Sequence, residues 1–352
     1  MSENMELDPD PSCNGLSPMF LLSTERSGSN LVRSILNTHP DISAPHPLET
    51  GYPWGKVTSP HEMGEGAARK LIRDVVINKN YSYHPLEVPM DVDSVYDVWR
   101  RQPPHSLLSL QKALYTECTR REGNSGWVSK YPALWKCLDG IEEFYEEPRF
   151  IYLVRDPRDV VLSFKTSNVG RYHPYFNTER WREEQERGIE FLERHEDRIH
   201  LIRYQDLLKD PEGEVKSLCE TIGFSYEPEM LFYYETESAK VASEKAEAFS
   251  NLSSPIKSDN YDKFYDRLPY REIKITEKVA MEEMEYFGFE PVHSREELEN
   301  FELNIEKYEE EDQRLDREAT VTEWSDNPRE EFKKQVTRSF AGYMVLRYGI
   351  LK

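Results

Sequence analysis

Short apolar runs alternate with amphipathic segments along the first two thirds of the chain. Residues 150–154 are wholly apolar, as expected of a strand that is buried on both faces of a parallel sheet. Two further strands are predicted at residues 18–24 and 200–204, and amphipathic helices at residues 29–38 and 211–222. This alternation predicts an α/β fold with a P-loop-like, doubly wound parallel sheet flanked by helices.

Composition assigns the segments between these elements. Residues 62–125 and 181–196 are predicted to be mostly helical, and residues 276–287 a helix ended by Gly288. Residues 41–61, rich in Pro, Gly and His, are predicted to be a loop that lines a site, and residues 167–180 a second, polar and aromatic loop.

The two ends of the chain differ from the middle. Residues 1–17 are polar and lack an apolar signal segment, so we expect a disordered N-terminal segment before a domain spanning residues 18–293. Residues 294–352 are predicted to be a charged helical C-terminal extension. Its last part has an apolar stripe at helical spacing, which predicts packing on the main domain or, in a homodimer, on a second subunit: Phe332, Val336, Phe340, Tyr343, Met344 and Leu346.

A phosphate-sized turn joins the first predicted strand to the first predicted helix. It reads Arg26, Ser27, Gly28, Ser29 and Asn30. A strand, a tight turn and a helix N-terminus together make an anion site, because the first backbone N–H groups of the helix point at the ligand. The Lys of an ATP-binding P-loop is missing, so we expect the bound phosphate to belong to a ligand other than ATP.

A second basic residue lies at the end of the apolar run 150–154. Arg155 follows that strand, Asp156 is a predicted N-cap, and Pro157 is a predicted first helical residue. Ser163 comes near the second turn of this helix. Ligands of open α/β sheets bind at the carboxyl ends of the strands, where Arg155 is expected.

These two segments resemble the sulfotransferase superfamily, whose members use 3′-phosphoadenosine 5′-phosphosulfate (PAPS) as sulfuryl donor. The likeness is to the bacterial and tyrosylprotein branches and extends from about residue 18 to residue 291. It implies that the loop from Arg26 to Asn30 cradles the 5′-phosphosulfate. It also implies that Arg155 and Ser163 grip the 3′-phosphate.

Two smaller matches extend the resemblance. Tyr204, in a Tyr-Gln-Asp-Leu segment, matches a family tyrosine that contacts the nucleotide. Lys130, in a Lys-Tyr-Pro segment, matches a lysine that supports the transferring sulfuryl group. Residues 238–271 resemble the segment that closes over both substrates. They lack the family's Arg-Lys-Gly pattern, so their contacts stay open, with Ser253, Ser254 and Lys257 as candidates.

The implied chemistry is in-line sulfuryl transfer, in which positioning and charge stabilisation dominate. Arg26 is the predicted cation for the negative charge that grows on the bridging oxygen, and being always charged it acts electrostatically. The attacking hydroxyl needs a base, and the following loop offers His46 and Glu49. The resemblance favours Glu49, whereas His46 has the intrinsic pKa better suited to a base.

Charge and composition exclude several other classes. The formal net charge is −21, from 45 Lys and Arg against 66 Asp and Glu, which argues against a nucleic acid or an anionic membrane as partner. The four cysteines form no Cys-x-x-Cys pair and the histidines no His-x-x-x-His pair, so no metal is expected. No apolar run is long enough for an integral membrane segment, and a cytoplasmic protein is expected.

The predicted function is transfer of the sulfuryl group of PAPS to a hydroxyl or amine of a carbohydrate, glycolipid or small-molecule acceptor. Aromatic residues in the loops offer stacking surfaces for such an acceptor. One alternative is a P-loop nucleotide kinase or other phosphotransferase, which requires a Walker-type Lys and a magnesium-binding Asp. Another is a non-catalytic PAPS-binding protein.

Overall fold

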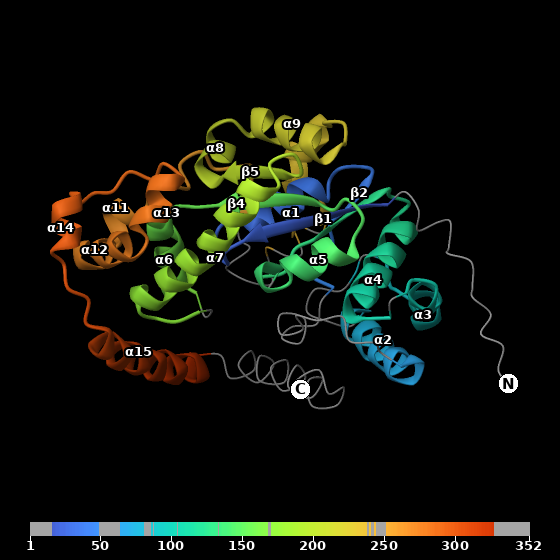
Figure 1. The fold of residues 1–352 in the computed structure, drawn as a ribbon, viewed down its shortest axis with the longest axis horizontal. Coiled ribbons are helices and arrows are strands. Elements are labelled where there is room, and N and C mark those ends of the chain that lie inside the picture. The colour runs from blue at the N-terminus through green and yellow to red at the C-terminus, as the bar shows by residue number, and fades with distance from the viewer. Residues whose placement is uncertain are drawn as a thin grey trace.

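A parallel sheet of five strands forms the centre of the molecule (Figure 1). In this computed structural model the described residues are 16–48, 64–80, 86, 88–103, 105–132, 134–167, 170–237, 239–240, 243 and 251–326. The strands lie in the order β2-β3-β1-β4-β5, and all pairs are parallel. Their bounds are β1 Ser17–Ser23, β2 Ile42–Ser43, β3 Gly126–Ser129, β4 Arg149–Val154 and β5 Ile199–Arg203.

Alternate residues of the central strands enter two separate cores. Phe20 of β1 and Phe150 of β4 pack into one core, and Leu21 and Ile151 into the other. This double burial is why these strands are apolar at successive positions. The second core is covered by helices α1 (Ser29–Leu36), α8 (Tyr204–Lys209) and α9 (Pro211–Ile222). The first is covered by α4 (Leu107–Glu122), α5 (Leu138–Phe144) and α7 (Pro174–Arg194), so the predicted doubly wound α/β fold is confirmed.

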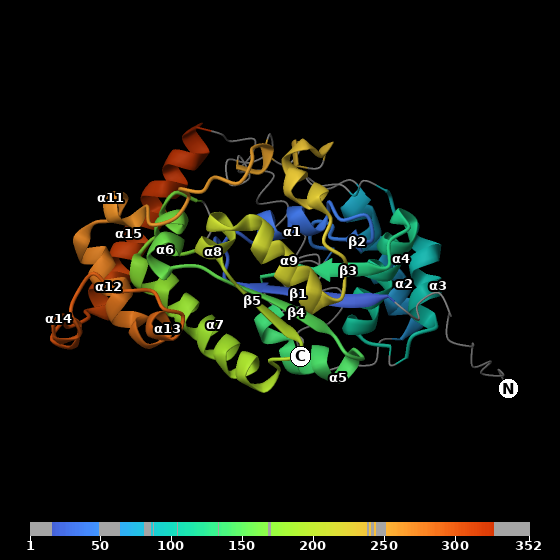
Figure 2. The same cartoon turned by 90° about the horizontal axis from the view of Figure 1, so that it is seen from above.

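The remaining elements surround this sandwich. Helices α2 and α3 lie at the β2 edge of the molecule, and α11 to α14 at the opposite end (Figures 1 and 2). Their bounds are α2 Glu65–Asn80, α3 Val92–Arg100, η3 Leu134–Lys136, α6 Pro157–Lys165, η4 Pro228–Glu235, α11 Phe264–Arg267, α12 Tyr270–Val279, α13 Met281–Tyr286, α14 Arg295–Glu299 and α15 Ile305–Asp326.

Part of the loop predicted at residues 167–180 is helical instead. Helix α7 begins at Pro174, because His173 caps it by accepting a hydrogen bond from the Tyr175 N–H at 3.2 Å and proline suits the first helical position. The helix predicted at residues 276–287 is divided into α12 and α13 at Ala280. Gly288 follows α13 with φ +69°, the left-handed conformation expected at a helix end.

Helix α15 (Ile305–Asp326) includes the charge-dense residues 306–318 and makes specific contacts with the start of α7. The Tyr308 ring stacks on His173 with centroids 4.5 Å apart. The Asp312 carboxylate accepts hydrogen bonds from the Tyr172 N–H (2.8 Å) and the His173 N–H (2.7 Å) and pairs with Arg171. The charged helix is thereby attached to the start of α7. The predicted apolar stripe and the predicted N-terminal segment up to residue 15 lie outside the described residues.

Among the described residues, no helix combines the length and the apolar character needed to cross a bilayer.

Candidate active site

The backbone of the turn after β1 leaves N–H groups at the start of α1 without a side-chain cap. Arg26 and Gly28 both have positive φ, +71° and +98°, and α1 begins without a side-chain cap on its N-terminal N–H groups. The Ser27 hydroxyl oxygen is buried and has no hydrogen-bond partner among the described residues. An uncapped helix start beside an unpartnered hydroxyl fits an anionic group.

Four of the predicted residues come from the carboxyl edge of the sheet. Arg26 lies in the turn after β1, and Lys130, Arg155 and Tyr204 directly follow β3, β4 and β5. Parallel strands end at the same edge, and the strand order reverses around β1, which is where open α/β sheets bind ligands.

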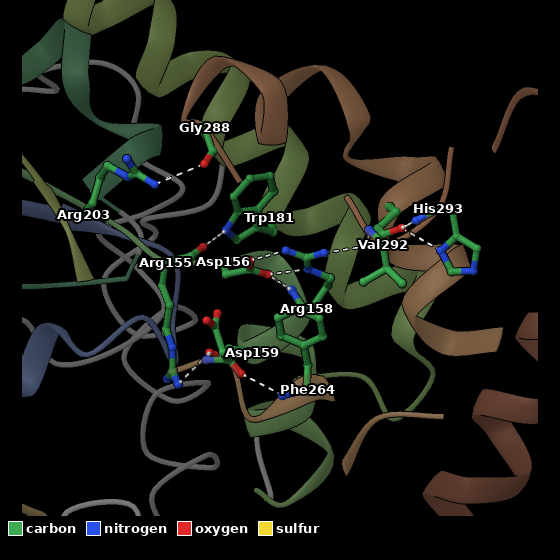
Figure 3. Close-up of polar contacts among 12 residues, drawn as sticks. Arg155, Asp156, Arg158, Asp159, Trp181, Arg203, Phe264, Gly288, Val292 and His293 are labelled. Atoms are coloured by element: carbon green, nitrogen blue, oxygen red, sulfur yellow. Dashed lines mark hydrogen bonds and ion pairs between the residues drawn. The ribbon is translucent and has the colours of Figure 1, made fainter. Parts of the chain in front are cut away.

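Arg155 contacts four residues from separate segments of the chain. Its Nη1 donates to the Arg26 carbonyl at 3.1 Å, and its Nη2 donates to the Asn260 carbonyl at 3.3 Å. Nη2 also lies 3.6 Å from the Asp159 carboxylate, and the guanidinium sits 4.6 Å from the centre of the Tyr204 ring. Figure 3 shows this side chain extending alongside Asp159. Its Nε is buried with no partner among the described residues, so the group keeps donor capacity for a ligand.

The two predicted phosphate motifs meet directly. Nε of Arg26 donates to the Ser163 hydroxyl at 3.1 Å, although the two residues are far apart in sequence. Burial and the nearby positive charge of Arg155 lower the pKa of the Arg26 guanidinium, and Glu25 opposes them. Two cations held so close favour a bound anion that would neutralise both.

These side chains line one cavity of about 560 Å³. The predicted residues in its lining are Arg26, Gly28, Ser29, Asn30, Lys130, Arg155, Ser163 and Tyr204. Ser27, in the same turn, is buried and is not among the described lining residues.

The segment predicted to close over the substrates supplies another side of the cavity. Lys257 lines it as suggested, whereas Ser253 and Ser254 are not among the described lining residues. The sequence interpretation missed Asn251, Leu252, Pro255, Ile256, Asn260, Lys263 and Arg267. The recurring basic residues of this segment were a usable signal, since a polyanion site needs several cations.

Asn260 joins this segment to Tyr204. Its side-chain amide donates to the Tyr204 hydroxyl at 2.8 Å, and its amide oxygen accepts from the Lys263 ammonium at 2.6 Å. Burial, Arg267 and Arg155 lower the pKa of Lys263. An anion in the cavity would relieve this repulsion among cations.

Neither predicted base is among the described residues that line the cavity. His46 is half-buried and is not among the described lining residues, and Glu49 lies outside the described residues. The carboxylates in the described lining are Glu25 and Asp159, which the sequence interpretation did not single out for the site. Glu25 pairs with Arg180 at 2.6 Å.

Arg158, three residues after Arg155, belongs to a buried group of ion pairs. It is buried and pairs with Asp156 and Glu277, each at 2.6 Å. Burial by itself lowers the pKa of this guanidinium, but the hydrogen bonds and charges of the two carboxylates outweigh burial and raise it. Glu277 also accepts hydrogen bonds from the Val292 and His293 N–H groups, at 2.8 and 3.0 Å.

An all-parallel sheet with an arginine-bearing anion turn at its carboxyl edge defines a P-loop-like α/β protein. The chain belongs to the sulfotransferase family: the family model matches residues 18–228, which is more than half of the chain. The family membership sets the kinase alternative aside.

Two solved structures share the fold. The sulfotransferase domain of the Synechococcus PCC 7002 olefin synthase is 21% identical, with a TM-score of 0.54 over 79% of this chain and 97% of that domain. The sulfotransferase domain from the curacin biosynthetic pathway is 24% identical, with a TM-score of 0.52 over 78% of this chain and 98% of that domain. No curated protein sequence matches the chain.

Proposed function

We propose that this sulfotransferase uses PAPS and transfers its sulfuryl group to a hydroxyl or amine of a carbohydrate, glycolipid or other small molecule. The observation that carries the proposal is the meeting of Arg26, Arg155 and Ser163 in one cavity. Two phosphate-sized sites in one cavity suit a nucleotide that carries anionic groups at both its 3′ and 5′ positions.

Each part of the donor has a matching set of residues. The turn from Arg26 to Asn30 and the start of α1 are proposed to hold the 5′-phosphosulfate. Arg155 and Ser163 are proposed to hold the 3′-phosphate. Apolar lining residues offer a surface for the adenine ring: Leu208, Tyr233, Leu252 and Ile256.

The proposed reaction forms a bond from the acceptor oxygen or nitrogen to sulfur and breaks the bond from sulfur to the bridging oxygen. The leaving 5′-phosphate gains negative charge, which Arg26 and Lys130 stabilise from the cavity wall. The acceptor proton goes to a base. Glu49 and His46 stay the two proposed bases, and His46 would have to approach the cavity to act.

Acceptor class and compartment are proposals as well. The two similar domains come from an olefin synthase and from a biosynthetic pathway, which favours a small biosynthetic molecule over a protein as acceptor. The described residues contain no group of three or more potential metal ligands. The reaction is proposed, as from the sequence, to need no metal and to take place in the cytoplasm.

Thermal unfolding with 3′-phosphoadenosine 5′-phosphate tests the donor site. Ligand at 100 times its Kd should add about 2.7 kcal/mol to the free energy of unfolding and raise the Tm. The effect should be lost in Arg155→Ala and kept in Arg149→Ala, because Arg149 lies at the opposite end of β4. A stronger response to ATP with Mg²⁺, or to AMP, would overturn PAPS dependence.

Activity separates the enzyme from a non-catalytic PAPS-binding protein. With an acceptor found by screening, Glu49→Ala or His46→Ala should abolish turnover while donor binding persists. Donor binding without transfer to any acceptor in the wild-type protein would favour the non-catalytic alternative.

A further inference from the structure

Asp159 is a buried carboxylate next to a site built for anions. It lies in the first turn of α6, is 1% exposed, and its side chain faces the cavity together with Arg155. A negative charge here opposes the binding of a polyanion through simple Coulomb repulsion. A structural role of the Asp159 carboxylate would offset this unfavourable effect on binding.

The hydrogen bonds of Asp159 identify that role. One carboxylate oxygen accepts from the Asp262 N–H at 2.8 Å. The other accepts from the Phe264 N–H at 3.1 Å, as Figure 3 shows. Asp262 has φ +57°, a left-handed conformation that needs support from its surroundings. Phe264 is the first residue of α11, so Asp159 caps that short helix from a distant part of the chain.

The segment fastened in this way carries ligand-facing groups. Asn260 and Lys263 lie in it, and both line the cavity beside Arg155. The Asn260 carbonyl accepts from Arg155, and its side chain bonds Tyr204 and Lys263. Asp159 thus links α6 to the turn that closes one side of the Arg155 site.

We propose that Asp159 is a positioning residue that fastens residues 260–264 over Arg155 and thereby makes the site select a 3′-phosphorylated nucleotide. This inference rests on the proposed function, in which Arg155 receives the 3′-phosphate. Lys263 is the second cation that the fastened turn brings to that phosphate. Without Asp159, Asn260 and Lys263 lose the support that holds them beside Arg155.

The charge of Asp159 and its positioning role predict opposite results, which makes the test sharp. Asp159→Asn removes a negative charge 3.6 Å from Arg155, so an effect of charge alone would tighten binding of a phosphorylated ligand. An amide can accept only one of the two N–H groups and presents a donor to the other. The positioning role therefore predicts weaker binding.

The experiment is calorimetric titration of the full chain with 3′-phosphoadenosine 5′-phosphate and with AMP, which lacks the 3′-phosphate. In Asp159→Asn the preference for the 3′-phosphorylated ligand should fall about tenfold, the equivalent of one charge-assisted hydrogen bond, with AMP affinity little changed. Lys165→Ala is the matched control: it removes an α6–α12 ion pair to Glu272 and should keep the wild-type preference.

The outcomes separate this inference from the proposed function. An unchanged or increased preference in Asp159→Asn would overturn the positioning role. No preference in the wild-type protein would instead overturn the proposed donor. If Asp159→Asn does not fold, Lys263→Met removes a cation that the turn presents and should lower the preference by the same factor; an unchanged preference there would also overturn the inference.

Discussion

Gly28 occupies a position that no other residue fits. Its φ is +98°, and a Cβ added there would lie 2.7 Å from Cδ2 of the Tyr204 ring. The backbone of the anion turn therefore approaches Tyr204 closely, and glycine meets both the conformational and the steric demand. The close approach also keeps Tyr204 beside Arg155.

Gly28→Ala should lower the free energy of unfolding by more than backbone strain alone, which is about 1–2 kcal/mol for a left-handed residue. Gly123→Ala supplies the comparison, since Gly123 has φ +79° and no atom within 4 Å of the added Cβ. Urea unfolding of both variants measures the difference. Equal losses would contradict a steric conflict with Tyr204.

A single residue, His200, makes the free energy of unfolding depend on pH. Burial lowers its pKa to about 4, against about 6.5 in an unfolded chain. Between these values the unfolded chain binds a proton that the folded chain does not, so stability falls as the pH falls from 6.5 towards 4. The loss should reach about 2 kcal/mol by pH 5, and His200→Gln should flatten the unfolding free energy between pH 7 and pH 5. An unaltered slope would show that other groups control it.

At the scale of elements, buried charges join α6 to α12. Arg158 at the start of α6 is paired with Asp156 and with Glu277 of α12, and all three are buried. The Glu277 carboxylate in turn is hydrogen-bonded to His293, through the backbone N–H and the ring Nδ1 of that histidine. The C-terminal helices are thus attached to the helix that carries Asp159 and Ser163.

Arg158→Met should cost about 3–5 kcal/mol of unfolding free energy, because two buried carboxylates lose their cation. Arg295→Met is the matched surface change. Arg295 pairs with Glu285 and Glu299 in exposed positions, and its loss should cost below about 1 kcal/mol. Chemical denaturation of both variants measures the two losses in unfolding free energy. Similar losses would show that the buried network contributes little to stability.

At the scale of the whole molecule, the cavity is rich in positive side chains although the net charge of the chain is negative. The chain carries −21, yet Arg26, Lys130, Arg155, Lys257, Lys263 and Arg267 line one cavity. Salt screens interactions between exposed charges beyond about 8–10 Å, whereas partly buried charges close to a ligand are screened less. Local cations would therefore control the binding of the proposed anionic donor, and the acidic surface matters mainly for solubility.

The residues that follow strands could be predicted from sequence. An apolar run ending in Arg155 and a helix-start signal at Asp156 and Pro157 are local features, and the same holds for the turn at Arg26. The two-residue strand β2 could not be found this way, because it is too short to show a pattern. The start of α7 was missed because its cap is a histidine and its first turn is aromatic.

The burial of Arg158 and the role of Asp159 could not be predicted. Both depend on partners more than a hundred residues away, Glu277 for the first and Asp262 and Phe264 for the second. Hydrophobic periodicity reports which face of an element is buried, but it does not report which distant chain covers that face.

The sequence by itself determined the α/β alternation, the turn at residues 26–30 and the family, since these follow from apolar runs, turn residues and motif spacing within short segments. Only the tertiary structure decided which of residues 251–267 line the cavity and that the backbone N–H groups of Asp262 and Phe264 bind the Asp159 carboxylate. The physical reason is that a parallel sheet brings strand ends together from separate parts of the chain. The hydrogen bonds around the site then join residues that are more than a hundred positions apart in the sequence, so no local pattern reveals them.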